Sequence, residues 1–231
     1  MDEKTCSACG GSGWVADGNE AKLCDCYQNR VYAVNVVSSR VPGRYFGSRL
    51  QDFELDTIKR KKALIEARRF LSEGITNGTG LLLQGPAGVG KTFLAAAILL
   101  EALNRPGVSG FFLDTRDFLA GIREKLQGGD GGKKEIKFAC NADVVVIDDL
   151  GNCRETEWAD DVISLIISRR YNEKRSTIFT TNYFDDGTEN DLSKKIGYRL
   201  RSRLYTMAYP VIIDGTDRRR RSDEYLCYSN V

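Results

Sequence analysis

The stretch GLLLQGPAGVGKTFLAAAILLEALN, residues 80–104, joins a short apolar run to a longer one through a glycine-rich turn. The first run, 80–85, has the length of a buried strand, and the second, 91–104, has the length of a helix. The turn between them, GPAGVGKT, matches the pattern G-x-x-x-x-G-K-[S/T] in the strand-to-helix context that this pattern requires. The stretch therefore predicts a phosphate-binding loop at the carboxyl end of a strand.

The residue types in this loop suit the binding of a nucleoside triphosphate. Its glycines allow backbone N–H groups to turn inward toward phosphate oxygens. Lys91 is expected to reach the β- and γ-phosphates, and the Thr92 hydroxyl is expected to bind Mg²⁺. A chance glycine-rich turn is the alternative, which the flanking strand and helix disfavour. The residues expected to contact the nucleotide are Gly85, Pro86, Ala87, Gly88, Val89, Gly90, Lys91, Thr92 and Phe93.

Strand-like and helix-like segments alternate around the loop. Strands are expected at 80–85, 109–114, 143–148, 176–182 and 209–214. Helices are expected at 57–74, 91–104, 115–127 (capped by Thr115), 155–174 and 192–207, and a surface loop at 128–134. This alternation predicts an α/β fold with a parallel sheet that is flanked by helices on both faces.

Two adjacent carboxylates follow a strongly apolar run in ADVVVIDDLG, residues 142–151. The run has the composition of a strand buried on both faces, and two neighbouring negative charges are costly there unless a cation compensates them. We therefore expect Asp148 to hold Mg²⁺, mostly through water, and Asp149 to act as the base that polarises the attacking water. The alternative is a solvated strand end, which the upstream phosphate loop disfavours.

The overall composition is that of an ordinary globular chain. It has 231 residues, 42% hydrophobic and 29% charged, with a net charge of +2. The absence of His excludes His metal ligands, His general bases and Ser–His or Cys–His catalytic pairs. The first residues show no apolar signal-peptide core, and the longest apolar run, 93–100, is too short to span a bilayer. We therefore expect a cytoplasmic protein without membrane association.

A cysteine cluster occupies the first 30 residues. Cys6, Cys9, Cys24 and Cys26 follow the spacing C-x2-C-x14-C-x-C, and four thiolates suit tetrahedral Zn²⁺. A segment this small has no core that would fold it without a metal, so we expect a structural zinc knuckle. An iron–sulfur cluster and free thiols are the alternatives. The remaining cysteines are isolated and are interpreted as packing or surface thiols: Cys140, Cys153 and Cys227.

From about residue 41 onward, the chain resembles the DnaC/DnaI/IstB-like AAA+ ATPases, a family of bacterial replicative-helicase loaders and helper ATPases of certain transposons. The resemblance rests on the two motifs above and on VPGRYFGSRLQDFELD (41–56), TIFTTN (177–182), IGYRLRSRL (196–204) and VIIDGTDRR (211–219). In the family, these four segments flank the adenine, form the sensor-1 strand, form the box VII helix and carry the sensor-2 Arg. The resemblance implies a compact AAA+ fold with a minimal lid or none.

The resemblance also implies roles for three polar residues. Asn182 would be the sensor-1 residue beside the γ-phosphate, although Asn also forms turns at strand ends. Arg203 would be the arginine finger that reaches a neighbouring subunit's nucleotide, although a solvated basic face would carry the same charges. Arg219 aligns best with the sensor-2 Arg. The register within Arg218–Arg221 stays open, and a basic tail on phosphate backbones is the alternative.

Three units are expected: a four-cysteine zinc-binding knuckle at 1–30, a connector and adenine-flanking segment at 31–56, and an AAA+ ATPase domain at 57–231. Cys-rich knuckles occur at the N-terminus of some loaders, where that end contacts the helicase.

By this resemblance, the protein hydrolyses ATP to ADP and phosphate and loads a hexameric replicative ring helicase onto single-stranded DNA. Its cofactors would be ATP, Mg²⁺ and Zn²⁺, and it would self-associate with ATP at subunit interfaces. An IstB-like transposase helper is the main alternative. A small-molecule P-loop kinase lacks an acceptor site here, and a binding module with a decayed ATPase conflicts with intact Lys91, Thr92 and Asp148. DNA contacts are expected only for the region around Arg116, Arg123, Lys125, Arg154 and Trp158. Taken singly, the charges are interpreted as solvated and Trp158 as packing at a helix start.

Overall fold

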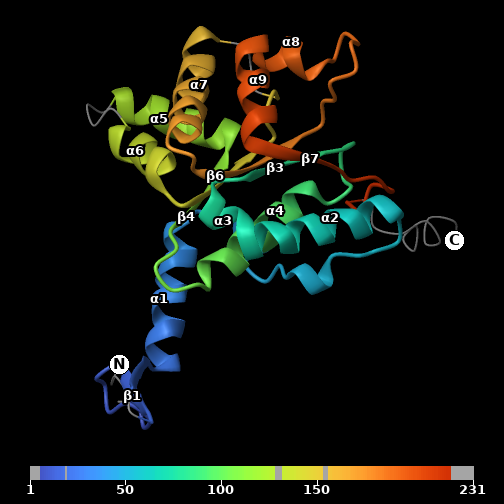
Figure 1. Cartoon of the computed structure of the whole chain (residues 1–231). Helices are drawn as coiled ribbons and strands as arrows, with labels where there is room; N and C mark the ends of the chain where they lie inside the picture. Colours follow the sequence, from blue (N-terminus) through green and yellow to red (C-terminus); the bar gives the residue numbers. More distant parts are fainter. Residues whose placement is uncertain (1–5, 19, 128–131, 153–155, 220–231) are drawn as a thin grey trace, which may run out of the picture.

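Five parallel strands form the central sheet (Figure 1). The computed structural model describes residues 6–18, 20–127, 132–152 and 156–219. In chain order the strands are β3 (Gly80–Gln84), β4 (Gly110–Asp114), β5 (Val144–Asp148), β6 (Ser176–Thr181) and β7 (Ala208–Ile212). Their spatial order is β4-β5-β6-β3-β7, so the phosphate-loop strand β3 lies beside β6, with β5 on the other side of β6. All five strands lie where the sequence predicts them.

Helices cover both faces of this sheet, as the alternation of segments predicts. One face carries α2 (Ile58–Arg69) and α4 (Lys91–Leu103), and the other carries α5 (Thr115–Gln127), α6 (Lys133–Asn141), α7 (Glu157–Asn172), α8 (Leu192–Ile196) and α9 (Tyr198–Met207). Side chains of a strand alternate between the two layers: Leu81 and Leu83 face α4, whereas Leu82 faces the α7 side. Because β5, β6 and β3 are parallel neighbours, their carboxyl ends meet along one edge of the sheet.

Three helices differ from the sequence prediction. The helix expected at 192–207 is two helices, α8 and α9, because Gly197 between them has a φ of +80°. The helix α6, which the sequence does not predict, begins at Lys133 inside the loop expected at 128–134, and residues 128–131 lie outside the described part of the chain. The helix expected at 57–74 ends as α2 at Arg69 and continues through a π-turn, Phe70–Gly74, into the short α3, Ile75–Asn77.

The expected cap of α5 is also wrong. The Asp114 carboxylate accepts the Arg116 and Asp117 N–H groups, at 3.0 and 3.1 Å, and so caps this helix. The Thr115 hydroxyl instead donates to the Asp148 carbonyl oxygen. Thr115 therefore fixes the end of β5, where the two adjacent carboxylates begin.

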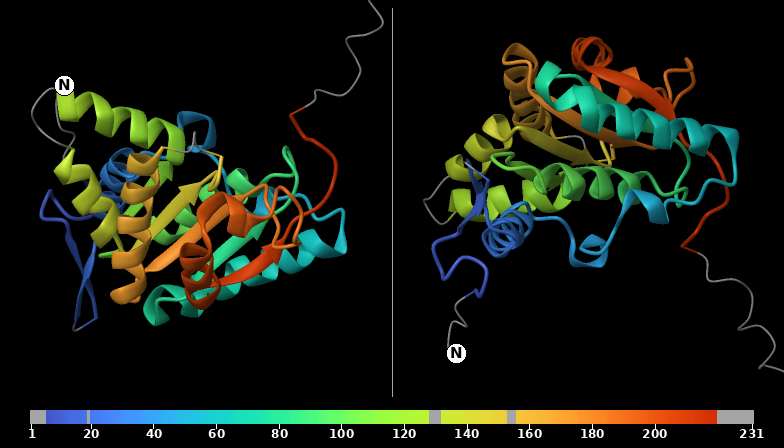
Figure 2. Two further views of the ribbon diagram at one scale, coloured as in Figure 1. Left: turned by 90° about the horizontal axis from the view of Figure 1, so that it is seen from above. Right: turned by 60° about the horizontal axis from the view of Figure 1, so that its bottom comes forward.

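The N-terminal segment forms an arm that extends from the core. A hairpin of β1 (Trp14–Asp17) and β2 (Glu20–Leu23) precedes the 14-residue helix α1 (Asp25–Ser38). The sequence predicts no regular structure here, and α1 crosses the expected unit boundary at residue 30. The C-terminal end of α1 lies beside α4, and its other end carries the hairpin away from the sheet (Figures 1 and 2).

After α1, the chain returns to the core through a connector. This connector contains two short 3-10 helices, Gly43–Tyr45 and Leu50–Asp52. Both lie against α4, the helix that follows the phosphate loop. In the part of the chain that the structure describes, no helix has the length and apolar character needed to cross a bilayer.

Candidate nucleotide-binding site

The phosphate loop connects β3 to α4 as the sequence predicts. Gly88 and Gly90 have φ values of +81° and +94°, a region that residues with a Cβ atom rarely adopt. A Cβ atom on Gly85 would lie 2.1 Å from the Ile213 carbonyl oxygen, so a close backbone approach requires glycine there. Pro86 and Ala87 form the exposed tip of the loop. Three glycines thus allow the loop to curl against the strand and helix that hold it.

Lys91 lies at the start of α4 with its ammonium group turned into the loop. Its Nζ donates to the carbonyl oxygens of Gly85 and Pro86, at 2.8 and 2.7 Å, and to the Asn182 side-chain oxygen at 2.7 Å. Burial lowers the pKa of Lys91 to about 8, while the carboxylates of Asp148 and Asp149 oppose this shift. A buried cation held only by neutral oxygens is suited to bind an anionic ligand.

The Thr92 hydroxyl and the Asp148 carboxylate meet across the loop. Thr92 Oγ1 donates to Asp148 Oδ1 at 3.0 Å, and the buried Thr180 hydroxyl donates to the same oxygen at 2.5 Å. Burial raises the pKa of Asp148, and hydrogen bonds from Thr180 and Thr92 oppose the rise. A hydroxyl and a carboxylate in contact are the oxygen donors that Mg²⁺ takes in phosphate-loop proteins, so these residues fit the ion.

Asp149 follows in a backbone conformation that is unusual for a residue with a side chain. Its φ is +58°, and its N–H donates to Thr180 Oγ1 at 2.9 Å. Its carboxylate accepts from the Asn152 amide at 2.6 Å and from the Asn182 amide at 3.3 Å. The neighbouring strand β6 therefore holds both acidic residues through a single threonine hydroxyl.

Asn182 connects the two halves of this cluster. Its oxygen accepts from Lys91 and its amide nitrogen donates to Asp149, so it lies between the phosphate-loop cation and the expected base. A neutral amide in this position can form hydrogen bonds with both charged groups without adding a charge of its own. The structure thus brings together Lys91, Thr92, Asp148, Asp149 and Asn182, which come from three strand ends.

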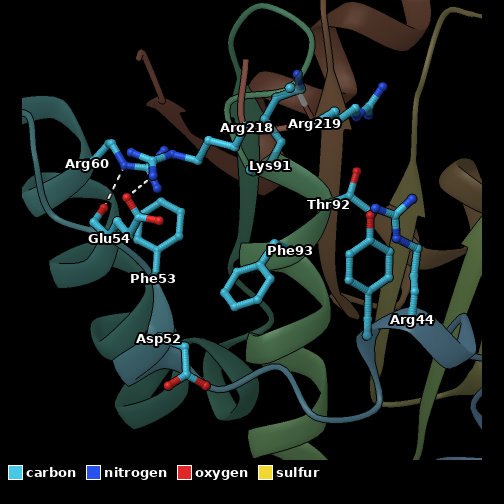
Figure 3. A pocket seen from close by; sticks show the side chains of 13 residues that line it. Arg44, Asp52, Phe53, Glu54, Arg60, Lys91, Thr92, Phe93, Arg218 and Arg219 are labelled. Atoms are coloured by element: carbon cyan, nitrogen blue, oxygen red, sulfur yellow. Dashed lines mark hydrogen bonds and ion pairs between the residues drawn. The ribbon is translucent and has the colours of Figure 1, made fainter. Parts of the chain in front are cut away.

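A cavity of about 210 Å³ opens beside the loop (Figure 3). The rings of Phe53 and Phe93 line it nearly parallel, with centroids 6.5 Å apart and an angle of 18° between the planes. Such aromatic walls suit a flat base. Phe93 was expected from the loop motif, and Phe53 belongs to the segment that the resemblance places beside the adenine.

Arg60 is a cavity residue that sequence reasoning missed. Its side chain is almost fully buried, and it donates to the Val89 and Glu54 carbonyl oxygens, at 2.5 and 2.6 Å. It also pairs with Asp56 and lies 4.2 Å from the Phe53 ring centroid. Arg60 therefore fixes the aromatic wall to the phosphate loop. Arg60 lies on the same face of α2 as the buried Ala63, Leu64 and Ala67. This helical spacing was the sequence signal that could have identified it as a buried arginine.

The connector contributes two further cavity residues that sequence reasoning missed, Arg44 and Tyr45. Burial raises the pKa of the Tyr45 phenol, the Arg44 charge lowers it, and the Asp148 carboxylate raises it. These neighbours place the phenol at the Thr92–Asp148 end of the cavity. The adjacent Arg-Tyr pair in VPGRYFGSRL was the available signal, since Arg is frequent at anion sites.

The two predicted arginines lie in different places. Both Arg218 and Arg219 line the cavity, but Arg218 is paired with Glu54 and Asp56, which leaves Arg219 as the better candidate of the two for contact with a nucleotide. Arg220 and Arg221 lie outside the described residues. Arg203, on α9, is away from this cavity: it donates to the Ser168 hydroxyl and lies 6.0 Å from the Tyr171 ring, both on α7.

The four N-terminal cysteines come together on the arm. Their Sγ atoms all lie within 4.8 Å of one another, with Cys6–Cys24 at 3.8 Å and Cys9–Cys26 at 3.5 Å. Tetrahedral coordination with Zn–S bonds of about 2.3 Å places sulfur atoms about 3.8 Å apart, so the cluster fits zinc. The Gly13 N–H lowers the pKa of Cys9 to about 6, and the Cys24 thiol raises the pKa of Cys26 to about 12.

The residues considered for DNA contact lie partly on one groove. Arg116, Arg123 and Trp158 line a groove of about 510 Å³ between α5 and the start of α7, with the Arg123 guanidinium 5.2 Å from the Trp158 ring. Lys125 instead pairs with Glu135, and Arg154 lies outside the described residues. Among these residues, Arg116 and Arg123 with Trp158 offer a combined basic and aromatic surface.

Comparisons with known proteins agree with this site. Residues 49–221 match the model of the IstB-like ATP binding protein family. The chain is 27% identical over 155 residues to the replicative helicase loader DnaC of Escherichia coli (strain K12), covering 67% of this chain and 61% of that protein. It is 28% identical over 151 residues to the replicative helicase loader DnaI of Bacillus subtilis (strain 168), covering 62% and 48%. The matches thus span about three fifths and about half of these relatives.

A solved structure gives the same result for the fold. A crystal structure of the DnaC helicase loader superposes with a TM-score of 0.67 at 33% identity, covering 74% of this chain and 99% of that one. The expected AAA+ P-loop fold is thereby confirmed. Beyond β7 the described residues, which end at 219, contain no helix that would form a lid. The chain belongs to the IstB-like ATP binding protein family.

Proposed function

We propose that the protein is an ATP-hydrolysing loader that places a replicative ring helicase onto single-stranded DNA. The observation that carries this proposal is the cluster of Lys91, Thr92, Asp148, Asp149 and Asn182 in a chain similar to two named replicative helicase loaders. The cluster supplies a phosphate cation, metal ligands, a base and a water-orienting amide. The similarity supplies the partner.

Each residue has a distinct part in the proposed hydrolysis. Lys91 exchanges its contacts with loop carbonyls for the β- and γ-phosphates, and Thr92 and Asp148 hold Mg²⁺. Mg²⁺ held there would supply positive charge to the phosphate oxygens. Asp149 accepts a proton from the attacking water, which Asn182 orients. Arg219 contacts the phosphates from the cavity wall, and Arg203 acts on the nucleotide of a neighbouring subunit.

The Asp149 carboxylate gives a first prediction. Asp149→Asn should slow single-turnover hydrolysis about a hundredfold, because the proton acceptor is lost. ATP affinity should stay close to that of the wild-type protein, since Asp148 and Thr92 still hold the metal. Rapid-quench kinetics and equilibrium titration measure the two quantities. Asp161→Asn, an exposed position on α7, is the control, and hydrolysis by Asp149→Asn at the wild-type rate would exclude Asp149 as the base.

We further propose that the cysteine cluster binds one structural Zn²⁺ per chain and shapes the end of the arm. The four sulfur atoms already have the spacing of a tetrahedral zinc–thiolate site, and Gly13 turns an N–H toward Cys9. The neighbouring thiols raise the pKa of Cys26, so that without a metal this thiol opposes full ionisation of the cluster. A divalent cation removes that opposition, because it binds all four as thiolates.

The zinc proposal gives a second prediction. Metal analysis of the purified protein should find one zinc per chain, and acid or a chelator should release it because the ligands must be thiolates. Cys9→Ser should lower the zinc content, while Cys140→Ala, which removes a buried core thiol outside the cluster, should not. A protein that is free of metal and yet keeps an ordered arm would contradict the proposal.

The loader function is tested by reconstitution. The protein should bind the replicative ring helicase of its own cell and stimulate its loading onto single-stranded DNA coated with binding protein. Lys91→Ala protein serves as the nucleotide-dead control. If affinity capture with ATP recovers a transposase instead of the ring helicase, the transposase-helper alternative is correct. Binding to neither, with an intact ATPase, would leave the loader proposal without support.

DNA contact and self-association are part of the same proposal. The Arg116–Arg123–Trp158 groove suits single-stranded DNA, because Arg contacts phosphates and a Trp ring stacks on bases. The groove is connected to the catalytic cluster, since Arg116 donates to the Asn152 carbonyl oxygen at 3.0 Å and Asn152 holds Asp149. Self-association would bring Arg203 of one subunit to the nucleotide of the next.

A further inference from the structure

The connector between the arm and the core lines the nucleotide cavity near Thr92, at the end where Mg²⁺ is expected. The short 3-10 helix Gly43–Tyr45 lies against α4, and Arg44 and Tyr45 line the cavity together with Lys91 and Thr92. Figure 3 shows Arg44 beside Thr92, on the opposite side of the cavity from Arg60 and Glu54. The resemblance assigns the connector to the adenine, whereas this part of it faces the place of the phosphates.

Arg44 differs from two other arginines of the cavity, Arg60 and Arg218, in its partners. Arg60 pairs with Asp56, and Arg218 pairs with Glu54 and Asp56. Arg44 forms no ion pair with any residue that the structure describes, and its guanidinium carbon lies 5.1 Å from the Tyr45 ring centroid. An exposed guanidinium that faces a binding cavity without a carboxylate keeps its full capacity to bind an anion.

The position of Arg44 is fixed by the segment before it. The Ser39 carbonyl oxygen accepts the Phe112 N–H of β4 at 2.6 Å, and the Val41 side chain is buried in the core. The Tyr45 N–H donates to the Pro42 carbonyl oxygen at 2.8 Å, which closes the short helix. The backbone that carries Arg44 is therefore ordered before any ligand binds, which lowers the entropic cost of a contact.

We propose that Arg44 binds the phosphate chain of the nucleotide from within the same subunit, and that the Tyr45 ring orients its guanidinium. This inference rests on the proposed nucleotide site and adds a cation to it. Lys91 approaches the phosphates from the loop, Arg219 from the C-terminal segment and Arg44 from the connector. The ligand class is a nucleoside di- or triphosphate, and adenosine lacks the group that Arg44 contacts.

Equilibrium titrations with ATP, ADP and adenosine test the proposal. Arg44→Ala should weaken ATP and ADP binding about tenfold to a hundredfold, the value of a charge-assisted hydrogen bond, and leave adenosine binding unchanged. Arg44→Lys should restore part of the affinity, because it restores the charge without the fork. Arg49→Ala, an exposed arginine of the same connector outside the cavity, should bind all three ligands like the wild-type protein.

The outcomes separate this inference from the nucleotide site itself. Wild-type ATP affinity in Arg44→Ala, with a loss in Lys91→Ala, overturns the role of Arg44 alone. Wild-type affinity in both variants overturns the nucleotide site. A parallel loss of adenosine binding in Arg44→Ala shows a distorted cavity and also overturns a phosphate contact. The melting temperature of the ligand-free variant should equal that of the wild-type protein, because the Arg44 side chain is exposed.

Discussion

Replacement of Lys91 by alanine should weaken ATP binding on the order of 2–5 kcal/mol, the range for one partner of a buried charge pair. The reason is the position of the ammonium group. Only 7% of the Lys91 surface is exposed, and its Nζ is held by three neutral oxygens. In Lys91→Ala, the terminal phosphates of ATP would lie against the carbonyl oxygens of the loop without the ammonium group that compensates their negative charge.

Titration with a fluorescent ATP analogue measures this effect. Lys137→Ala, an exposed lysine on α6, is the control and should bind like the wild-type protein. The rate of hydrolysis should fall together with ATP affinity. Among the described residues, no other cation bonds to both the loop carbonyls and the Asn182 side chain. Unchanged affinity in Lys91→Ala would remove the phosphate-loop assignment, and with it the basis of the proposed function.

The fold was predictable because its strongest signals are local. The apolar runs at 80–85 and 143–148 have the length of strands buried on both faces, and the glycine-rich turn between 85 and 92 requires a strand before it and a helix after it. The structure confirms both strands and the helix at their expected positions. The order of the strands in the sheet comes from long-range pairing, which no local pattern encodes.

The missed elements have weaker or conflicting local signals. The helix α6 follows the glycine-rich stretch 128–132, which suggests a loop. Its Phe138 lies 5.4 Å from Phe111, edge to face, so tertiary packing stabilises the helix. Gly197 lies inside an apparently continuous helical pattern, and only its positive φ separates α8 from α9. These features depend on contacts and backbone angles that the local sequence does not determine.

The residues of the cluster Lys91, Thr92, Asp148, Asp149 and Asn182 were predicted one by one, whereas the residues that hold them in place were not. Motifs identify Lys91, Thr92 and Asp148 because phosphate chemistry demands those residue types at fixed spacing. The Thr180 hydroxyl, which contacts both acidic residues, carries no motif of its own, since Thr is common in any strand. Arg44 and Arg60 reach the cavity from segments distant in sequence. Residues that act through tertiary contacts can be found only once the fold is known.

Arg203 is expected to act on a neighbouring subunit, and its position in this chain is compatible with that expectation. It lies on α9, away from the cavity of its own subunit, where it contacts Ser168 and Tyr171 of α7. The two other arginines of this helix differ from it: Arg201 pairs with Asp185, and the exposed Arg199 has no ion pair among the described residues. The guanidinium of Arg203 from the next subunit would add a positive charge to a cavity that is already lined by Lys91, Arg44 and Arg219.

Arg203→Ala should therefore lower the rate of the chemical step of hydrolysis in the assembled protein by about 10³- to 10⁵-fold, the range known for arginine fingers. ATP binding should be retained. Ser168→Ala removes the hydroxyl that holds Arg203 within its own chain and leaves the guanidinium in place, so this control should keep most of the activity. A comparable loss in Ser168→Ala would indicate that Arg203 serves the packing of α7 against α9.

Mixing distinguishes a contribution between subunits from one within a subunit. Arg203→Ala protein binds ATP and keeps Asp148 and Asp149, whereas Lys91→Ala protein cannot bind ATP but carries an intact Arg203. Neither should hydrolyse ATP when assembled alone on DNA or helicase. The mixture should regain part of the activity, because Arg203 of a Lys91→Ala subunit enters the functional site of its neighbour. If assembly is intact and mixing restores nothing, Arg203 does not act in trans, and the same experiment with the exposed Arg199 shows whether the finger lies one turn earlier on α9.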